Sequence, residues 1–315
     1  MNETRRAVLE ALESGPVTGP AVSERLGVSR TAVWKHVEAL RAAGFEIASD
    51  GDGYALASVP EFGGAAVEYG LEAPFSVEYH DAVASTNARA RALAAEGAEN
   101  VVVLADEQTG GRGRLDRLWA SPSGGVWSSV LLRPDLPPAQ VPLLTLATGV
   151  ATVRAVEPLG VDAGLKWPND VLVGRQGGDP RADEPKLAGI LTEMAGEADR
   201  TAWVVVGVGL NANVDADALP PGATSLREQV GDVDRRELVQ RLLASLDALV
   251  TAPERILPEW REVSLTLGRR VRVTTASGAV VGTATDVEPP GRLVVETDDG
   301  PVRVHAGDCE HLRPA

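Results

Sequence analysis

"QTGGRGRLDRLWASPSGG", residues 108–125, places five glycines and three arginines in eighteen positions. Glycine is costly inside a helix and this stretch is too charged for an ordinary buried strand, so we predict a loop. Glycines let backbone N–H groups curve around an anion, and Arg112, Arg114 and Arg117 can offer paired donors to a phosphate or carboxylate. On these residues alone, an anion-binding loop and a solvated surface loop both remain open.

The segments around this loop alternate strand-like and helical patterns. Strands are predicted at "FSVEYH" (75–80), "NVVVLADEQ" (100–108) and "VWSSVLLRP" (126–134), with helices from Thr86 and over residues 141–156. "AGLKWPNDVLV" (163–173), "KLAGILTEMAG" (186–196) and "TAWVVVGVGLNANV" (201–214) follow, then a helical segment over 235–260. Because the connections within this trio are too short for helices, we expect adjacent antiparallel strands.

The two ends of the chain have different patterns. Residues 1–60 predict a helix over 3–14, a second from about Gly19, a third capped by Ser29 and running to about Ala43, then two short strands around an Asp-Gly turn. This is typical of a winged helix-turn-helix domain. We expect a linker over 61–73, a central domain over 74–265 and a small all-β barrel over 266–315. The predicted fold class is α+β.

Composition restricts the classes of function. The net charge is −15, which argues against general binding of polyanions, and only three of the 30 basic residues are lysines. This composition suits a high-salt cytoplasm or follows from a GC-rich genome; both explanations stay open. The single cysteine, Cys309, allows no disulfide within the chain. With no run of about 18 apolar residues and no secretory pattern at the start, we expect a cytoplasmic protein without a membrane segment.

Residues 81–304 contain neither histidine nor cysteine, which excludes a Ser–His or Cys–His nucleophile there. An enzyme built on this region would work by positioning its substrates and stabilising charge with cations. Lys166 and Lys186 lie beside glycine- or proline-marked strand ends and are candidates, although edge lysines occur at such places without function. Asp170 could bind a metal, accept a proton or simply form a turn.

These motifs carry a resemblance to a known family. In order, "GGRGRLDRLWASPSGGVWSS" (110–129), "KWPNDVLV" (166–173), "KLAGIL" (186–191) and "VVVGVGLNAN" (204–213) look like the motif set of biotin protein ligases. With the N-terminal domain, the chain resembles the bifunctional form that is also the biotin operon repressor. The resemblance implies a central mixed sheet with helices, related to class II aminoacyl-tRNA synthetases. It also implies biotin, ATP and Mg²⁺ as ligands, biotinyl-adenylate as intermediate and a biotin carboxyl carrier lysine as acceptor.

The resemblance also implies roles for individual residues. Lys186 would face the biotin carboxylate and the reacting phosphate, Asp170 would lie near Mg²⁺ or accept a proton, and Trp119 would stack on adenine or act as a buried anchor. The other implied contacts are Ser85, Thr86, Asn87 and Gln108 for biotin, Arg112, Gly113 and Arg114 for biotin and the adenylate, Lys166, Asn169 and Asn211 for ATP, and Gly189 in the second lysine motif.

Two departures from the family pattern are visible. Asp116 stands where many relatives have glycine, and aspartate tolerates the left-handed backbone conformation, so we expect the loop geometry to survive. The segment "GRQGGDPRADEP" (174–185) is a long connection that we expect to be a surface excursion.

DNA binding is expected from the third helix, with Arg30, Thr31, Lys35 and Glu38 on its exposed side and operator DNA as partner. Residues 1–60 hold six basic and eight acidic side chains, a weak electrostatic footprint for a DNA-binding domain. A homodimer is expected. Two alternatives remain: a regulator that senses biotin without catalysis, and a lipoate-type ligase.

Overall fold

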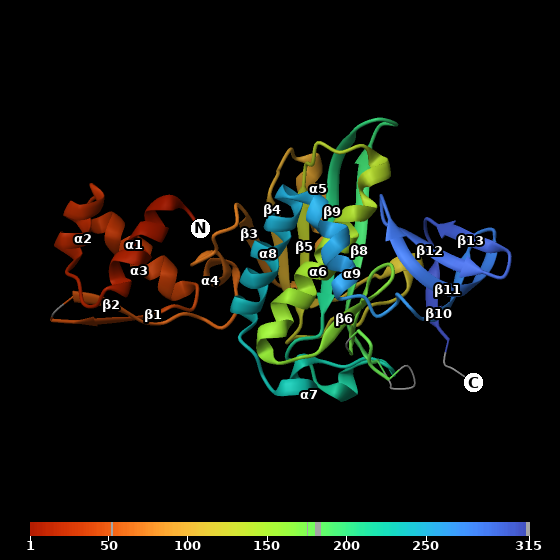
Figure 1. The fold of residues 1–315 in the computed structure, drawn as a ribbon. Helices are drawn as coiled ribbons and strands as arrows, with labels where there is room; N and C mark the ends of the chain where they lie inside the picture. The colour runs from red at the N-terminus through yellow and green to blue at the C-terminus, as the bar shows by residue number, and fades with distance from the viewer. Residues whose placement is uncertain (52, 175, 180–183, 313–315) are drawn as a thin grey trace.

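The computed structural model describes residues 1–51, 53–174, 176–179 and 184–312. Three units follow one another in space (Figure 1). A small helical unit lies at the N-terminal end, a large sheet covered by helices lies in the middle, and a second, smaller sheet lies at the C-terminal end. The predicted α+β class is therefore confirmed.

The N-terminal unit is a winged helix-turn-helix. Its elements are α1 (Glu3–Glu13), α2 (Gly19–Leu26), α3 (Arg30–Ala42), β1 (Glu46–Asp50) and β2 (Gly53–Ser58). Thr18 and Ser29 cap α2 and α3, each accepting a backbone N–H three residues later. One stripe of each helix packs into a separate core that includes Val8, Val33 and Val37. The expected wing spans residue 52, which lies outside the described residues.

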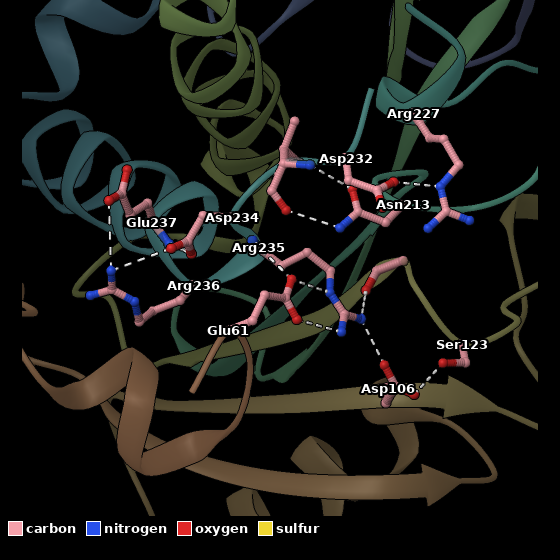
Figure 2. A network of polar contacts seen from close by, with 12 residues as sticks. Glu61, Asp106, Ser123, Asn213, Arg227, Asp232, Asp234, Arg235, Arg236 and Glu237 are labelled. Carbon is pink, nitrogen blue, oxygen red and sulfur yellow. Dashed lines mark hydrogen bonds and ion pairs between the residues drawn. The ribbon is translucent and has the colours of Figure 1, made fainter. Parts of the chain in front are cut away.

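The stretch expected as a linker contains a helix, α4 (Gly64–Glu68), and is anchored to the central unit. The guanidinium of Arg235 bonds Glu61 at 2.8 Å and Asp106 at 2.6 Å (Figure 2). It also lies 4.0 Å from the ring centre of Phe62. Burial opposes ionisation of Asp106, but hydrogen bonds from Ser123 and Arg235 hold its pKa below the ordinary value. Glu61 and Phe62 of the segment are thus held by Arg235, a mostly buried residue of the central unit that Asp106 also binds.

The central unit is a seven-stranded mixed sheet in the order β3-β4-β5-β9-β8-β7-β6. β3 and β4 are parallel, and every other pair is antiparallel, as predicted for the trio of motif strands. The strands are β3 (Ser76–Val83), β4 (Val101–Gln108), β5 (Val126–Leu132), β6 (Ala163–Lys166), β7 (Asp170–Val173), β8 (Lys186–Gly196) and β9 (Thr201–Leu210). The helices are α5 (Thr86–Ala95), α6 (Pro142–Val156), α7 (Leu226–Val230), α8 (Arg235–Thr251) and α9 (Ile256–Glu262).

The helices cover both faces of this sheet. Along β4 and β9, Val103 and Val205 pack with α5, whereas their neighbours Val102 and Val204 join the main core with α6 and α8. This alternation follows from the two-residue period of a strand. The segment Pro138–Leu159 is long and apolar enough to cross a membrane, yet 67% of its most apolar window is buried inside the protein. Its helix α6 packs against one face of the sheet and forms part of the main core.

The C-terminal unit is a five-stranded antiparallel sheet in the order β13-β12-β11-β10-β14. The small all-β domain expected at the C-terminal end is therefore present, and its described strands form a sheet with β13 and β14 at its two edges. Its strands are β10 (Arg270–Thr275), β11 (Gly278–Glu288), β12 (Arg292–Thr297), β13 (Gly300–Val304) and β14 (Asp308–His311). The indole N–H of Trp167 donates to the Gly291 carbonyl at 3.0 Å, and the Arg269 guanidinium pairs with Glu184. The expected excursion over 174–185 lies partly, and residues 313–315 wholly, outside the described residues.

Candidate active site

A cavity of about 460 Å³ opens where β4, β8 and β9 meet the glycine- and arginine-rich loop. That loop folds back on itself, since the Gly113 N–H donates to the Arg117 carbonyl at 2.8 Å. The lining includes these residues singled out in the sequence: Ser85, Thr86, Asn87, Gln108, Arg112, Gly113, Arg114, Trp119, Asn169, Asp170, Lys186 and Gly189.

The loop adopts a left-handed backbone at two adjacent residues, Leu115 (φ 56°) and Asp116 (φ 55°). Asp116 thus has the left-handed conformation that aspartate tolerates. Leu115 is less suited to it, because its Cβ crowds the backbone, and strain of this kind is common at functional loops. Leu115 and Leu118 are also 75% and 79% exposed, so the loop presents apolar side chains to solvent.

Contacts from distant parts of the chain hold the loop over the cavity. Arg114 donates to the side-chain oxygen of Asn169 and to the backbone carbonyl of Gly307, each at 2.8 Å. Arg117 pairs with Asp308 at 2.6 Å, which is the main cause of the lowered pKa of Asp308. The C-terminal sheet therefore contributes directly to the cavity wall.

The charged centre of the cavity is formed by Lys186 and Asp170. The Lys186 ammonium lies 2.6 Å from a carboxylate oxygen of Asp170 and 4.9 Å from the ring centre of Trp119. The indole lies on the paired glycines of β8 and β9, where a Cβ at Gly209 would come within 2.5 Å of the indole nitrogen. That nitrogen is buried and has no hydrogen-bond partner among the described residues, so a ligand acceptor could satisfy it.

Another part of the cavity lining is polar and uncharged. Gln108 accepts from the backbone N–H of Thr86 at 2.9 Å and donates to the Ser121 hydroxyl at 2.9 Å. Ser85 caps α5, so the turn before this helix presents two hydroxyls and the Asn87 amide to the cavity, and Gln108 at the end of β4 adds a second amide. The combination suits a small ligand with both hydrogen-bond donors and acceptors.

Two residues singled out in the sequence lie outside the lining. Lys166 ends β6, and its charge acts toward β14, where it adds to the shifts in the pKa of Asp308 and His311. Asn211 is buried behind the cavity and donates to the Thr224 carbonyl at 2.9 Å. Both are neighbours of the site rather than part of its wall.

The cavity also contains residues that sequence reasoning missed. Ser128, Gly207, Gly209 and Asp308 line it. The two glycines stand two residues apart in the motif "VVVGVGLNAN", on the same face of β9. This spacing could have indicated a strand surface against which other side chains pack closely. Asp308 had no such signal, because it reaches the cavity only through docking of the C-terminal sheet.

On α3, the four residues singled out for DNA contact are all exposed. Glu38 is paired with Arg41 at 2.8 Å. Trp34, which sequence reasoning passed over, is 53% exposed on the same side, while Val33 and Val37 are buried beneath. An aromatic side chain of this size left in solvent on a DNA-binding helix is a further candidate contact.

Three family models match successive parts of the chain. A helix-turn-helix domain model matches residues 4–55, the Biotin/lipoate A/B protein ligase family model matches residues 81–211, and the Biotin protein ligase C terminal domain model matches residues 266–312.

Individual relatives agree with these matches. The chain is 36% identical over 314 residues to the Bifunctional ligase/repressor BirA of Bacillus subtilis, covering 93% of each chain. It is 40% identical to the Biotin--[acetyl-CoA-carboxylase] ligase of Mycobacterium tuberculosis, over 73% of this chain and 86% of that one. It is similar to the solved biotin protein ligase from Aquifex aeolicus in complex with biotin and ATP, with a TM-score of 0.62, 26% identity and coverage of 76% and 99%. The chain therefore belongs to the family of bifunctional biotin protein ligases that carry a helix-turn-helix repressor domain.

Proposed function

We propose that this protein activates biotin with ATP and transfers it to one lysine of a biotin carboxyl carrier domain. The observation that carries the proposal is one cavity lined both by uncharged polar side chains, including Thr86 and Gln108, and by the cations Arg112, Arg114 and Lys186. Biotin has a cyclic urea at one end and a carboxylate at the other. The carboxylate and the ATP phosphates are both anions, so bringing them together requires cations.

The reaction has two steps. A biotin carboxylate oxygen attacks the α-phosphorus of ATP, forming biotinyl-adenylate and releasing pyrophosphate. The amine of the acceptor lysine then attacks the biotinyl carbonyl carbon and AMP leaves, so the enzyme supplies no nucleophile. This agrees with the absence of histidine and cysteine from residues 81–304.

In this scheme the cavity residues position biotin and ATP and neutralise the negative charge of the carboxylate and phosphates. Lys186 would contact the biotin carboxylate and the α-phosphate, leaving Asp170 to accept a proton from the incoming amine. The arginine loop would close over the adenylate and exclude water. Trp119 would lie against adenine, with its unpartnered N–H available to a ligand acceptor.

Lys166 and Asn211 would act from outside the lining. Lys166 would add positive potential near the phosphates, and Asn211 would brace the segment between β9 and α7 through its bond to Thr224. Asn169 would hold Arg114 over the ligand.

Magnesium would arrive with ATP. Among the described residues no group of three acidic, histidine or cysteine side chains is placed to hold a metal, so a protein-built cage does not fit. One carboxylate plus phosphate oxygens and water is an ordinary set for Mg²⁺, and Asp170 fits that role once ATP draws Lys186 away. The ion supplies positive charge to the polyphosphate.

The N-terminal domain would give the protein a second function as a biotin-responsive repressor. The exposed face of α3, with Arg30, Thr31, Trp34 and Lys35, would enter the major groove of operator DNA, and a homodimer would place two such helices on a palindrome. We place the protein in the cytoplasm, where acceptor and operator both occur.

The decisive experiment mixes the purified protein with biotin, MgATP and a biotin carboxyl carrier domain. Intact-mass spectrometry should show one biotin on one acceptor lysine. Binding of biotin without any mass increase, in salt where the protein is folded, would favour the sensing regulator. Transfer of lipoate in place of biotin would favour a lipoate-type ligase.

A further inference from the structure

The short helix α4 and the residue after it pack into two separate cores at once. Ala65 and Tyr69, four residues apart, pack against the core of the N-terminal unit. Val67 between them is fully buried and belongs to the main core of the central unit. Successive residues of a helix are about 100° apart, so residues 65 and 69 share one face and residue 67 lies opposite. This segment is therefore packed on both sides.

On the side of the N-terminal unit the contact is aromatic. The ring of Tyr69 lies edge-on to the ring of Phe45, with 6.2 Å between the ring centres. Phe45 lies between α3 and β1 and is 2% exposed, so the Tyr69 ring helps to shield the N-terminal core from solvent. Turning the N-terminal unit away from α4 would expose both rings to water.

On the side of the central unit the segment is held by polar contacts. The side-chain nitrogen of Gln240 on α8 donates to the carbonyls of Val67 and Tyr69, at 2.8 and 2.7 Å. The ion pair of Arg235 with Glu61 holds the start of the segment (Figure 2). Moving the segment away from the central unit would break these contacts and expose Val67 to water.

Residues 61–71, which we call the junction, therefore hold the N-terminal unit in one orientation. A flexible linker lets two domains sample many relative orientations. Here the linking helix is common to both cores, so bending on either side of it exposes apolar side chains. The junction thus sets the position of α3 relative to the central sheet (Figure 1).

Exposed apolar side chains indicate which unit would form a dimer contact. Among the described residues of the N-terminal unit, the one large apolar side chain left exposed is Trp34, on the exposed face of α3. The central unit exposes Leu115, Leu118, Met194 and Val230. Because burial of apolar surface drives most association, the central units are better suited to form the dimer contact. The two α3 helices of such a dimer would lie at the ends of two rigid arms.

We propose that the junction makes the protein selective for the spacing between the two half-sites of its operator. The inference rests on the proposed function, because it starts from a homodimer bound to DNA. Two α3 helices on rigid arms fit half-sites at one distance and one rotation about the DNA axis. Inserting two base pairs between the half-sites moves one of them by about 7 Å and turns it by about 70°. Rigid arms cannot follow this change, whereas loosely tethered domains can.

The test measures affinity for two duplexes in the presence of biotinyl-adenylate. One duplex carries the palindrome that the wild-type protein selects from random-sequence DNA, and the other carries it with two base pairs inserted at the centre. The insertion should lower the affinity of the wild-type protein about tenfold or more. Tyr69→Ala should bind the selected palindrome about tenfold more weakly, because loose arms must be ordered on binding. The insertion should lower the affinity of this variant by no more than about threefold.

Three further variants make the comparison specific. Tyr69→Phe keeps the ring that contacts Phe45 and should match the wild-type protein. Glu61→Ala loosens the junction on the side of the central unit, and should also reduce the loss of affinity on insertion. Arg241→Ala is the matched control, because it removes an ion pair with Glu237 within α8 and leaves the junction intact. All four variants should ligate biotin to the carrier domain at the wild-type rate and bind an isolated half-site with wild-type affinity.

Several results would overturn the proposal. They are a wild-type protein that tolerates the insertion, a Tyr69→Ala variant that retains the full loss of affinity, or a Tyr69→Phe variant as tolerant as Tyr69→Ala. If Tyr69→Ala also loses affinity for the isolated half-site, its N-terminal core is damaged and Glu61→Ala replaces it. A reduced loss on insertion in Glu61→Ala then supports the proposal, and the full loss overturns it. A wild-type protein that selects no palindrome would refute the repressor function itself, whatever the variants do.

Discussion

The two arginine anchors of the loop differ in burial, and this difference predicts unequal effects on the intermediate. Arg114 makes two partly buried hydrogen bonds, to Asn169 and Gly307, which lie 55 and 193 residues away in sequence. A hydrogen bond from a charged donor contributes about 1.5–3 kcal/mol, so Arg114→Ala should cost the closed loop at least about 3 kcal/mol. That corresponds to about 100-fold in the ratio of closed to open loop.

Arg117→Ala is the matched control. Its ion pair with Asp308 joins side chains that are 66% and 51% exposed, and such surface pairs contribute about 0–1 kcal/mol, or at most about fivefold. The assay follows the release of radiolabelled biotinyl-adenylate from each variant and the labelling of bystander lysines on serum albumin. Arg114→Ala should release the adenylate about 100-fold faster than wild type at nearly unchanged melting temperature. Equal release rates from the two variants, or none above wild type, would refute the ranking of the anchors.

Three further predictions follow from the same structure. Lys186→Arg should slow adenylation by at least about tenfold, because a planar guanidinium replaces a compact ammonium beside Trp119; pyrophosphate release within a few-fold of wild type would contradict this. Burial and the charge of Arg269 lower the pKa of His311 to about 4, so the unfolded chain protonates first and the stability present above about pH 6.5 is lost as pH falls toward 4. Between pH 7.5 and 5 the wild-type free energy of unfolding in urea should fall about 2 kcal/mol more than that of His311→Gln, and parallel curves would disprove it. The affinity for operator DNA should fall only weakly with salt concentration and should rise when biotinyl-adenylate is present. Deletion of residues 1–60 should abolish this binding while ligation persists. If the protein shows no preference for its own upstream DNA over random DNA, the proposed repressor function is wrong.

Much of the fold could be read from local signals. Ser29 caps α3 because its side-chain oxygen accepts a nearby N–H, and this cap, with the proline at the start of α2, helped to locate the winged helix-turn-helix. Short connections between the motif strands predicted their antiparallel pairing, which the sheet shows. Half of the residues that line the cavity were also singled out, since the motifs lie at strand ends and in the loop, which meet at the cavity.

Other features depended on long-range packing, for which no local pattern exists. Arg235 anchors the segment near Glu61, although a Pro-, Gly- and Glu-rich stretch alone reads as a free linker. Lys166 stands in a family motif, yet it lies outside the lining and acts on the cavity only through its charge on Asp308, a residue of β14 that the docked C-terminal sheet brings to the cavity wall.

The sequence by itself therefore determined the elements, their pairing within the motif region and the chemistry of the loop, because caps, strand periodicity and glycine content act over about ten residues. Only the tertiary structure brought Gly307 and Asp308 to the glycine- and arginine-rich loop. It also brought Glu193 to Asn87, which lies 106 residues away in the sequence. Such contacts depend on the order of strands and on the docking of one sheet against another. Common residue types make these contacts, and the partners have no fixed spacing in the sequence, so no local pattern predicts them.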